Sequence, residues 1–131
     1  HRVFILVLGN TMNSHRHFMD GLKKQVALHE QSSENSCDVI IAFVPIVSRA
    51  GTDIQAAVER IRKDKPVVLV VLHHTFDVCS TPPDSRLCIN RDRMFAVDCL
   101  FYEDQGLLTC QRNDRAIREV KEHLKRTEHS E

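Results

Sequence analysis

Three short apolar runs, separated by amphipathic segments, constrain the fold more than any other feature of the sequence. The runs are VFILVL (Val3–Leu8), DVIIAFVPI (Asp38–Ile46) and VVLVVL (Val67–Leu72). Each is too short for a buried helix and rich in branched residues, so we expect strands covered on both faces. Between them, apolar residues recur at helical spacing. This alternation predicts a parallel sheet between two layers of helices, a three-layer α/β fold of flavodoxin-like type.

The rest of the chain fits one such domain over residues 1–131. A fourth apolar run, Met94–Tyr102, reaches a turn, and Leu107–Cys110 can return as its antiparallel partner at the sheet edge. Before it, residues 76–93 form a long irregular loop. Loops of that length are typical of lids, partner surfaces or disordered segments.

Composition excludes some classes of protein. Lys+Arg and Asp+Glu both number 18, and a nucleic-acid binder would show a basic excess, so we expect no nucleic-acid partner. No apolar run is long enough to span a membrane. The five cysteines are odd in number and contain no C-x-x-C pair, which indicates a reducing compartment and a cytoplasmic protein. Because the chain opens without a methionine, one residue before a strand, we interpret it as a domain trimmed from a longer chain.

Polar and small residues gather where the predicted strands end. Parallel sheets bind ligands outside the carboxyl ends of their strands, at the switch point of the topology. The loops after the first three strands therefore become neighbours. The candidate ligand-binding residues in and after them are Gly9, Asn10, Thr11, Ser48, Arg49, Gly51, Thr52, Gln55 and His73.

The loop S-R-A-G-T suggests an anion site. Gly51, before a helix start, would let the main chain approach a ligand closely. The free N–H groups of the first helical turn favour an anion, and Arg49 adds a guanidinium suited to phosphate. The alternative is that Gly51 serves only the turn and that Arg49 is a solvated surface charge.

Gln55 has two interpretations. In the first, Thr52 and Gln55 form a capping box at the start of the helix, each side chain bonding the other's main-chain N–H. Similar caps are expected at the first helix, from Asn13 or Ser14, and at the last, from Asn113 or Asp114 in the sequence QRND.

The second interpretation comes from a resemblance. The segments DVIIA, GTDIQAAV and KPVVLV resemble the core of the nucleoside 2-deoxyribosyltransferase family and, more distantly, TIR-type domains of the same flavodoxin-like architecture. The matching positions are Asp38, Gly51, Thr52, Lys65 and Pro66. In that family a glutamate one helical turn after the G-T pair attacks the anomeric carbon of the sugar. Gln55 occupies the corresponding position here.

An amide cannot form the glycosyl ester, because its lone pair is delocalised and it carries no charge. Glu59 lies about 6 Å further along the helix axis, too deep to replace the nucleophile. The resemblance therefore implies a nucleoside-like or nucleotide-like ligand and a lost hydrolase activity.

Other chemistry is weaker. His73 and His74 end a strand, and because neighbouring strand residues point to opposite faces, at most one of them faces the ligand. His15, His17, Cys79 and Cys88 lack zinc spacing, so we expect no metal and no cofactor. The last helix carries several basic residues that suit either an acidic partner or a solvated face: Arg112, Arg115, Arg118, Lys121, Lys125 and Arg126.

The sequence thus predicts a non-catalytic recognition or signalling module that binds a phosphate-bearing, nucleotide-like ligand or a protein partner at the strand ends. One alternative is a nucleosidase or NAD-cleaving glycohydrolase that uses Glu59, Glu103 or Asp104. Another is an interaction scaffold without a small-molecule ligand, which forms oligomers through its helices.

Overall fold

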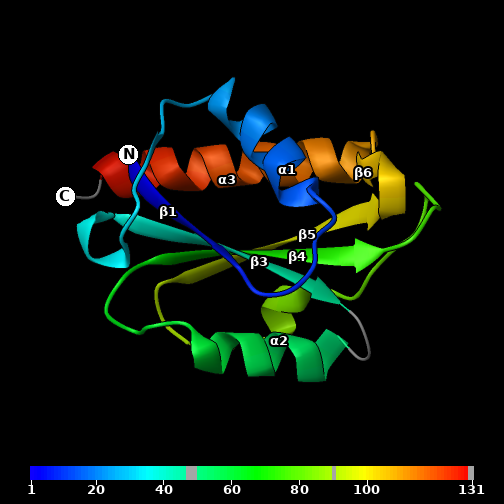
Figure 1. The fold of residues 1–131 in the computed structure, drawn as a ribbon, viewed down its shortest axis with the longest axis horizontal. Helices are drawn as coiled ribbons and strands as arrows, with labels where there is room; N and C mark the ends of the chain where they lie inside the picture. The colour runs from blue at the N-terminus through cyan, green and yellow to red at the C-terminus, as the bar shows by residue number, and fades with distance from the viewer. Residues whose placement is uncertain (47–49, 90, 130–131) are drawn as a thin grey trace.

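The computed structural model describes residues 1–46, 50–89 and 91–129, and Figure 1 shows its ribbon. The strands are β1 (Arg2–Val7), β2 (His29–Glu30), β3 (Val39–Ile46), β4 (Val67–His74), β5 (Met94–Tyr102) and β6 (Gly106–Leu107). The helices are α1 (Ser14–Lys23), α2 (Ala50–Arg60) and α3 (Gln111–His129), with short 3-10 turns η1 (Glu34–Ser36), η2 (Ser85–Cys88) and η3 (Glu103–Gln105).

The described strands form one sheet in the order β2-β1-β3-β4-β5-β6. Neighbours are parallel except for β6, which runs antiparallel against the end of β5. The order 2-1-3-4-5 of the parallel strands is that of flavodoxin-like folds. The predicted fold class is therefore confirmed, including the antiparallel edge strand.

Side chains of the central strands alternate between two cores. Ile41 and Val70 face the layer of α1 and α3, whereas Ile40 and Leu69 face α2. All four are fully buried, and each such side chain contributes about 1.5–3 kcal/mol relative to an exposed one. Figure 1 shows α1 and α3 on one side of the sheet and α2 on the other. Continuous apolar runs are required because both faces of each strand are covered.

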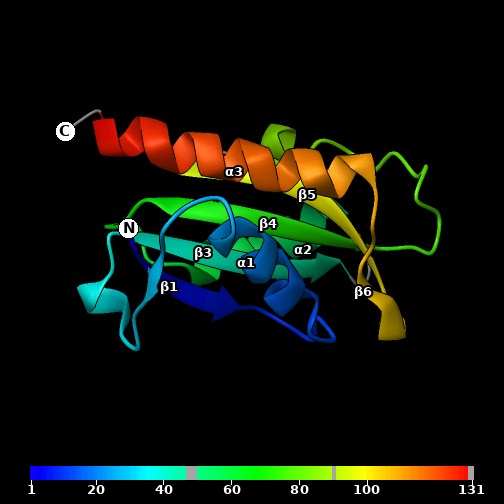
Figure 2. The same ribbon diagram turned by 90° about the horizontal axis from the view of Figure 1, so that it is seen from above.

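The carboxyl ends of β1, β3, β4 and β5 lie at one edge of the sheet, where the strand arrows point in Figure 1. We call this the carboxyl edge. Helices α2 and α3 both begin there and run back along the sheet. Seen from above in Figure 2, the segment after β4 loops past the start of α3 before it reaches η2. Residues far apart in sequence therefore meet at this edge.

Several strand boundaries differ from the prediction: β1 covers Arg2–Val7 rather than Val3–Leu8, and β6 covers Gly106–Leu107 rather than Leu107–Cys110. β4 extends two residues beyond the predicted run, to His74, so the histidine pair forms the last two residues of the strand. His73 pairs in register with Ile46 and Leu100. The short edge strand β2 was not predicted. It is exposed and polar, and therefore carries no apolar signal.

The predicted helix caps are wrong. α2 begins at Ala50 and α3 at Gln111, which puts Thr52 and Asn113 within the first turns and not before them. Asn13 does precede α1, but in a left-handed conformation and without a side-chain cap bond. Among the described residues, no helix has the length and apolarity that crossing a membrane demands.

Candidate functional site

The β1–α1 loop sits tightly against the end of β3. Gly9 has a φ of 140°, and a Cβ there would lie 2.7 Å from Cγ of Pro45. Only glycine adopts this conformation without strain, and only glycine leaves room for the proline ring. Packing against Pro45 is therefore enough to explain Gly9.

The polar groups of this loop are bonded to one another. The Oδ1 atom of Asn10 accepts from the Met12 N–H at 3.0 Å. Thr11 is 2% exposed, and its Oγ1 lies 2.5 Å from Nδ1 of His15. Burial, and then the nearby Arg16, lowers the pKa of His15, which favours the neutral ring that can accept this bond. The side chain of Thr11 is consequently not presented to a ligand.

The other half of the switch point is less fully described. Ser48 and Arg49 lie outside the described residues. Gly51, Thr52 and Gln55 are all exposed on α2. A Cβ at Gly51 would meet nothing within 4 Å, so neither a turn nor packing requires glycine there. Because Gln55 lies in the second turn, it cannot form the predicted capping box.

His73 points away from the loops and into the sheet face beneath η2. Its Nε2 lies 2.8 Å from Oδ1 of Asp98, and His73 is 9% exposed. Asp98 also accepts from the main-chain N–H of Ser85 at 3.0 Å and from the Ser85 hydroxyl. Since the carboxylate lies between the histidine and the serine, this is not the arrangement of a Ser-His-Asp hydrolase. The three residues fasten η2 to β4 and β5.

His74 faces the opposite side of the sheet, as the alternation of strand residues predicts. Its ring stacks on Tyr102 with centroids 4.9 Å apart, and its Nε2 lies 3.9 Å from Oε1 of Glu103. Glu103, Asp104 and Glu59 are exposed. Within the described ranges, no three His, Cys, Asp or Glu side chains are grouped as metal ligands.

A hollow of about 380 Å³ opens at the carboxyl edge, between the segment after β4 and the start of α3. We call it the anion hollow. Its lining comprises Val78, Cys79, Ser80, Thr81, Thr109, Cys110, Gln111, Arg112 and Arg115. Hydroxyls, the first turn of a 19-residue helix and two guanidinium groups therefore surround one space.

Arg112 and Arg115 form no ion pair with any residue that the structure describes. They are three positions apart on α3 and thus neighbours on its surface. Both lie near the positive end of the helix dipole, which opposes a cation by roughly 0.3–1 kcal/mol. An anion in the hollow would reverse this cost and also meet the free N–H groups of the first turn.

A second hollow of about 250 Å³ continues from the first along β5. We call it the edge cleft. It shares Thr81, Arg112 and Arg115 with the anion hollow. The other lining residues are Pro82, Asp84, Arg86, Ala96, Val97, Asp98, Ala116 and Glu119. Together the two hollows form a groove from the carboxyl edge to the middle of β5.

Sequence reasoning assigned Arg112 and Arg115 only to a basic helix face and did not single out Asp98 or Ser85. A signal for Asp98 was present, since it is one charged residue inside an otherwise apolar run. No sequence feature indicated that Thr81 lies next to Arg112, because the two walls of the hollow come from segments far apart in the chain. No protein-family model, curated protein or solved structure matches this chain.

Proposed function

We propose that this protein is a non-catalytic recognition module that binds a phosphate-bearing ligand in the anion hollow at the carboxyl edge. The observation that carries the proposal is the pair Arg112 and Arg115, placed at the start of α3 without a counter-ion among the described residues. Phosphate offers the charge and the several acceptor oxygens that two guanidinium groups and helix N–H groups bind together.

Several other arginines of the chain have acidic partners. Arg2 meets Asp38 at 2.9 Å, and Arg16 meets Glu30 at 3.2 Å. These are exposed pairs, worth about 0–1 kcal/mol each. The contrast supports a different role for Arg112 and Arg115, which line a hollow and have no acidic partner in the described part of the chain.

The non-catalytic character is supported by the chemistry around the hollow. Among the described residues, the lining of the anion hollow contains no carboxylate or histidine, the side chains that most often act as a general base or a glycosyl nucleophile. In the adjoining edge cleft, Asp84 bonds to Arg86, and Asp98 bonds to His73 and Ser85. Gln55, which the resemblance places at the nucleophile position, is exposed on α2. A nucleotide-like ligand remains the chemical class that the resemblance favours.

The proposal is tested by calorimetric titration with pyrophosphate and a panel of nucleotides. Arg112→Ala and Arg115→Ala should each weaken binding by about tenfold or more, since a charge-assisted hydrogen bond contributes roughly 1.5–3 kcal/mol. Arg118→Ala is the matched control: it removes an exposed arginine of the same helix that lines neither hollow. Equal affinities in all three variants would contradict the proposal.

Cysteine alkylation gives a second, local readout. Cys79 is exposed and lines the anion hollow, whereas Cys88 lies outside its lining. Cys99 is fully buried, and its burial raises the pKa of the thiol. Pyrophosphate should slow alkylation of Cys79 and leave that of Cys88 unchanged. Release of free base from nucleosides or NAD by the wild-type protein would overturn the non-catalytic part of the proposal.

A further inference from the structure

The outer edge of β5 is only partly satisfied by the chain itself. At Leu100 the outward N–H donates to Oδ1 of Asn113 at 2.8 Å. The outward carbonyl of Leu100 accepts from Nδ2 of Asn113 at 2.8 Å and from the Leu108 N–H at 3.0 Å. A side-chain amide and one residue of main chain thus take the place of a neighbouring strand at this position.

At Asp98 and Ala96, two and four residues before Leu100, no described residue takes the place of a neighbouring strand. The Arg93 carbonyl accepts from the Val67 N–H of β4, and the Phe101 carbonyl accepts from the N–H of Thr75, the residue after β4. Strand alternation therefore directs the main-chain groups of Ala96 and Asp98 outward, like those of Leu100. Within the described part of the chain, these outward groups have no hydrogen-bond partner. An unpaired buried N–H or carbonyl costs about 1–3 kcal/mol, and Ala96 is 2% exposed.

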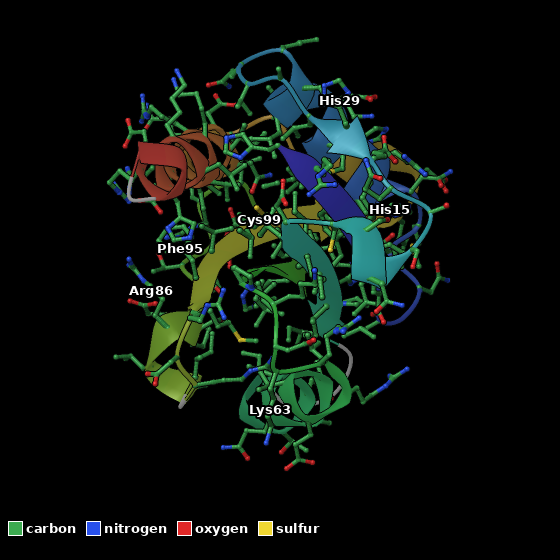
Figure 3. All side chains as sticks on the ribbon, turned by 90° about the vertical axis from the view of Figure 1, so that its left-hand side faces the viewer. His15, His29, Lys63, Arg86, Phe95 and Cys99 are labelled. Carbon is green, nitrogen blue, oxygen red and sulfur yellow. The ribbon has the colours of Figure 1, made fainter. Side chains whose placement is uncertain are left out.

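The edge cleft lies against this unpaired stretch. The cleft is lined by residues 96–98 of β5, by the segment around η2 on one side and by α3 on the other. Figure 3 shows β5 at the outer side of the sheet, with α3 and η2 flanking it and the labelled Arg86 and Phe95 on this side. The edge cleft therefore lies next to the unpaired main-chain groups of Ala96 and Asp98.

Two of the three acidic groups of the cleft are already engaged. Asp84 lies 3.2 Å from Nε of Arg86, and Asp98 accepts hydrogen bonds from His73 and Ser85. Glu119 acts electrostatically on Arg86, whose pKa is raised chiefly by its bond to Asp84. Arg112, Arg115 and Glu119 form no ion pair with a described residue, so two positive charges and one negative charge of the cleft are left unpaired.

We propose that the groove binds an extended peptide, which adds a strand to β5 and places an anionic side chain between Arg112 and Arg115. An extended peptide presents an N–H and a carbonyl toward its neighbour at every second residue, the repeat that Ala96 and Asp98 require. The inference rests on the proposed function in one respect, that the anion hollow receives the peptide's carboxylate or phosphate. Beyond that function, the inference proposes that the protein recognises the main chain of the peptide.

The test uses an acetylated and amidated seven-residue peptide of alternating valine and glutamate. Two further versions carry N-methyl groups on all the valines or on all the glutamates, and a fourth replaces glutamate with lysine. Because only every second residue of an added strand faces β5, methylation of one set should weaken binding at least tenfold and methylation of the other should have little effect. The lysine peptide should bind at least tenfold more weakly than the glutamate peptide.

The outcomes separate this inference from the proposed function. Pyrophosphate binding together with equal affinities for both N-methylated peptides and the parent would overturn strand addition and leave anion recognition standing. N-methyl-sensitive peptide binding without pyrophosphate binding would support strand addition and overturn recognition of a free phosphate compound. Absence of binding by both the parent peptide and pyrophosphate at millimolar concentration would overturn both.

Discussion

The two ends of the carboxyl edge differ in how their polar groups are used. At the β1/β3 switch point, the β1–α1 loop bonds its own polar atoms, as Thr11 and His15 show. In the groove beside α3, Arg112 and Arg115 have no ion-pair partner, and the outward main-chain groups of Ala96 and Asp98 have no hydrogen-bond partner, among the described residues. A cluster of polar residues in the sequence is therefore not a measure of groups available for a ligand. Donors and acceptors without a partner in the fold are a better indication of a binding site.

The largest expected effect is on the stability of the groove wall. Asn113 is 1% exposed and bonds to main-chain atoms of Leu100 and Leu108. Asn113→Ala should lower the free energy of unfolding by about 3 kcal/mol, because buried main-chain groups lose their partners. Asn113→Asp retains the acceptor for the Leu100 N–H but sets a buried carboxylate against the carbonyl oxygens of Leu100 and Leu108, so it should also be destabilising. Chemical denaturation measures both, and wild-type stability in Asn113→Ala would contradict the proposed anchoring.

The two glycines of the switch point should respond in opposite ways. Gly9→Ala should cost about 1–3 kcal/mol, because its positive φ and the contact with Pro45 both disfavour a Cβ. Gly51→Ala should be neutral or stabilising by up to about 1 kcal/mol, since alanine favours the helix and meets no neighbour. Destabilisation by Gly51→Ala would show that this helix start is more constrained than its geometry indicates. Denaturation midpoints of the two variants provide the comparison.

The sequence was sufficient for the sheet and insufficient for the groove. Continuous apolar runs such as Met94–Tyr102 predict buried strands because both faces must be covered. Helix starts were predicted from local capping residues, and Asn113 shows why this failed. Its amide binds β5 across the fold, a tertiary use that local sequence does not distinguish from a cap.

The meeting of loops at the carboxyl edge was predicted, whereas the side chains available to a ligand there were not. The carboxyl edge follows from topology alone. The availability of side chains there does not, because it depends on contacts such as that between His73 and Asp98. Arg112 and Arg115 were visible in the sequence as part of a basic helix face. Only the three-dimensional path of residues 78–81 places them in a hollow.

The smallest predicted effect is on the pH dependence of stability, and it compares the switch region with the part of α3 that packs on the start of β5. Burial lowers the pKa of His15 in the switch region and of His123, which stacks on Phe95 beside α3. Both histidines have a lower pKa in the folded protein than in the unfolded chain. The stability that depends on their neutral form is therefore fully present above about pH 6.5, the unfolded value, and is lost as the pH falls through the native pKa values. His15→Gln and His123→Gln should each flatten the decline of unfolding free energy between pH 7 and 5. A steeper decline in either variant would contradict this sign.

Amide chemical shifts during titration with pyrophosphate test most directly whether the anion binds in the groove or at the switch point. The hollow beside α3 predicts that the largest shifts fall in residues 78–81 and 109–115, the segments that contribute its lining. Shifts confined to residues 9–13 and 50–55 would place the ligand at the β1/β3 switch point and contradict the assignment.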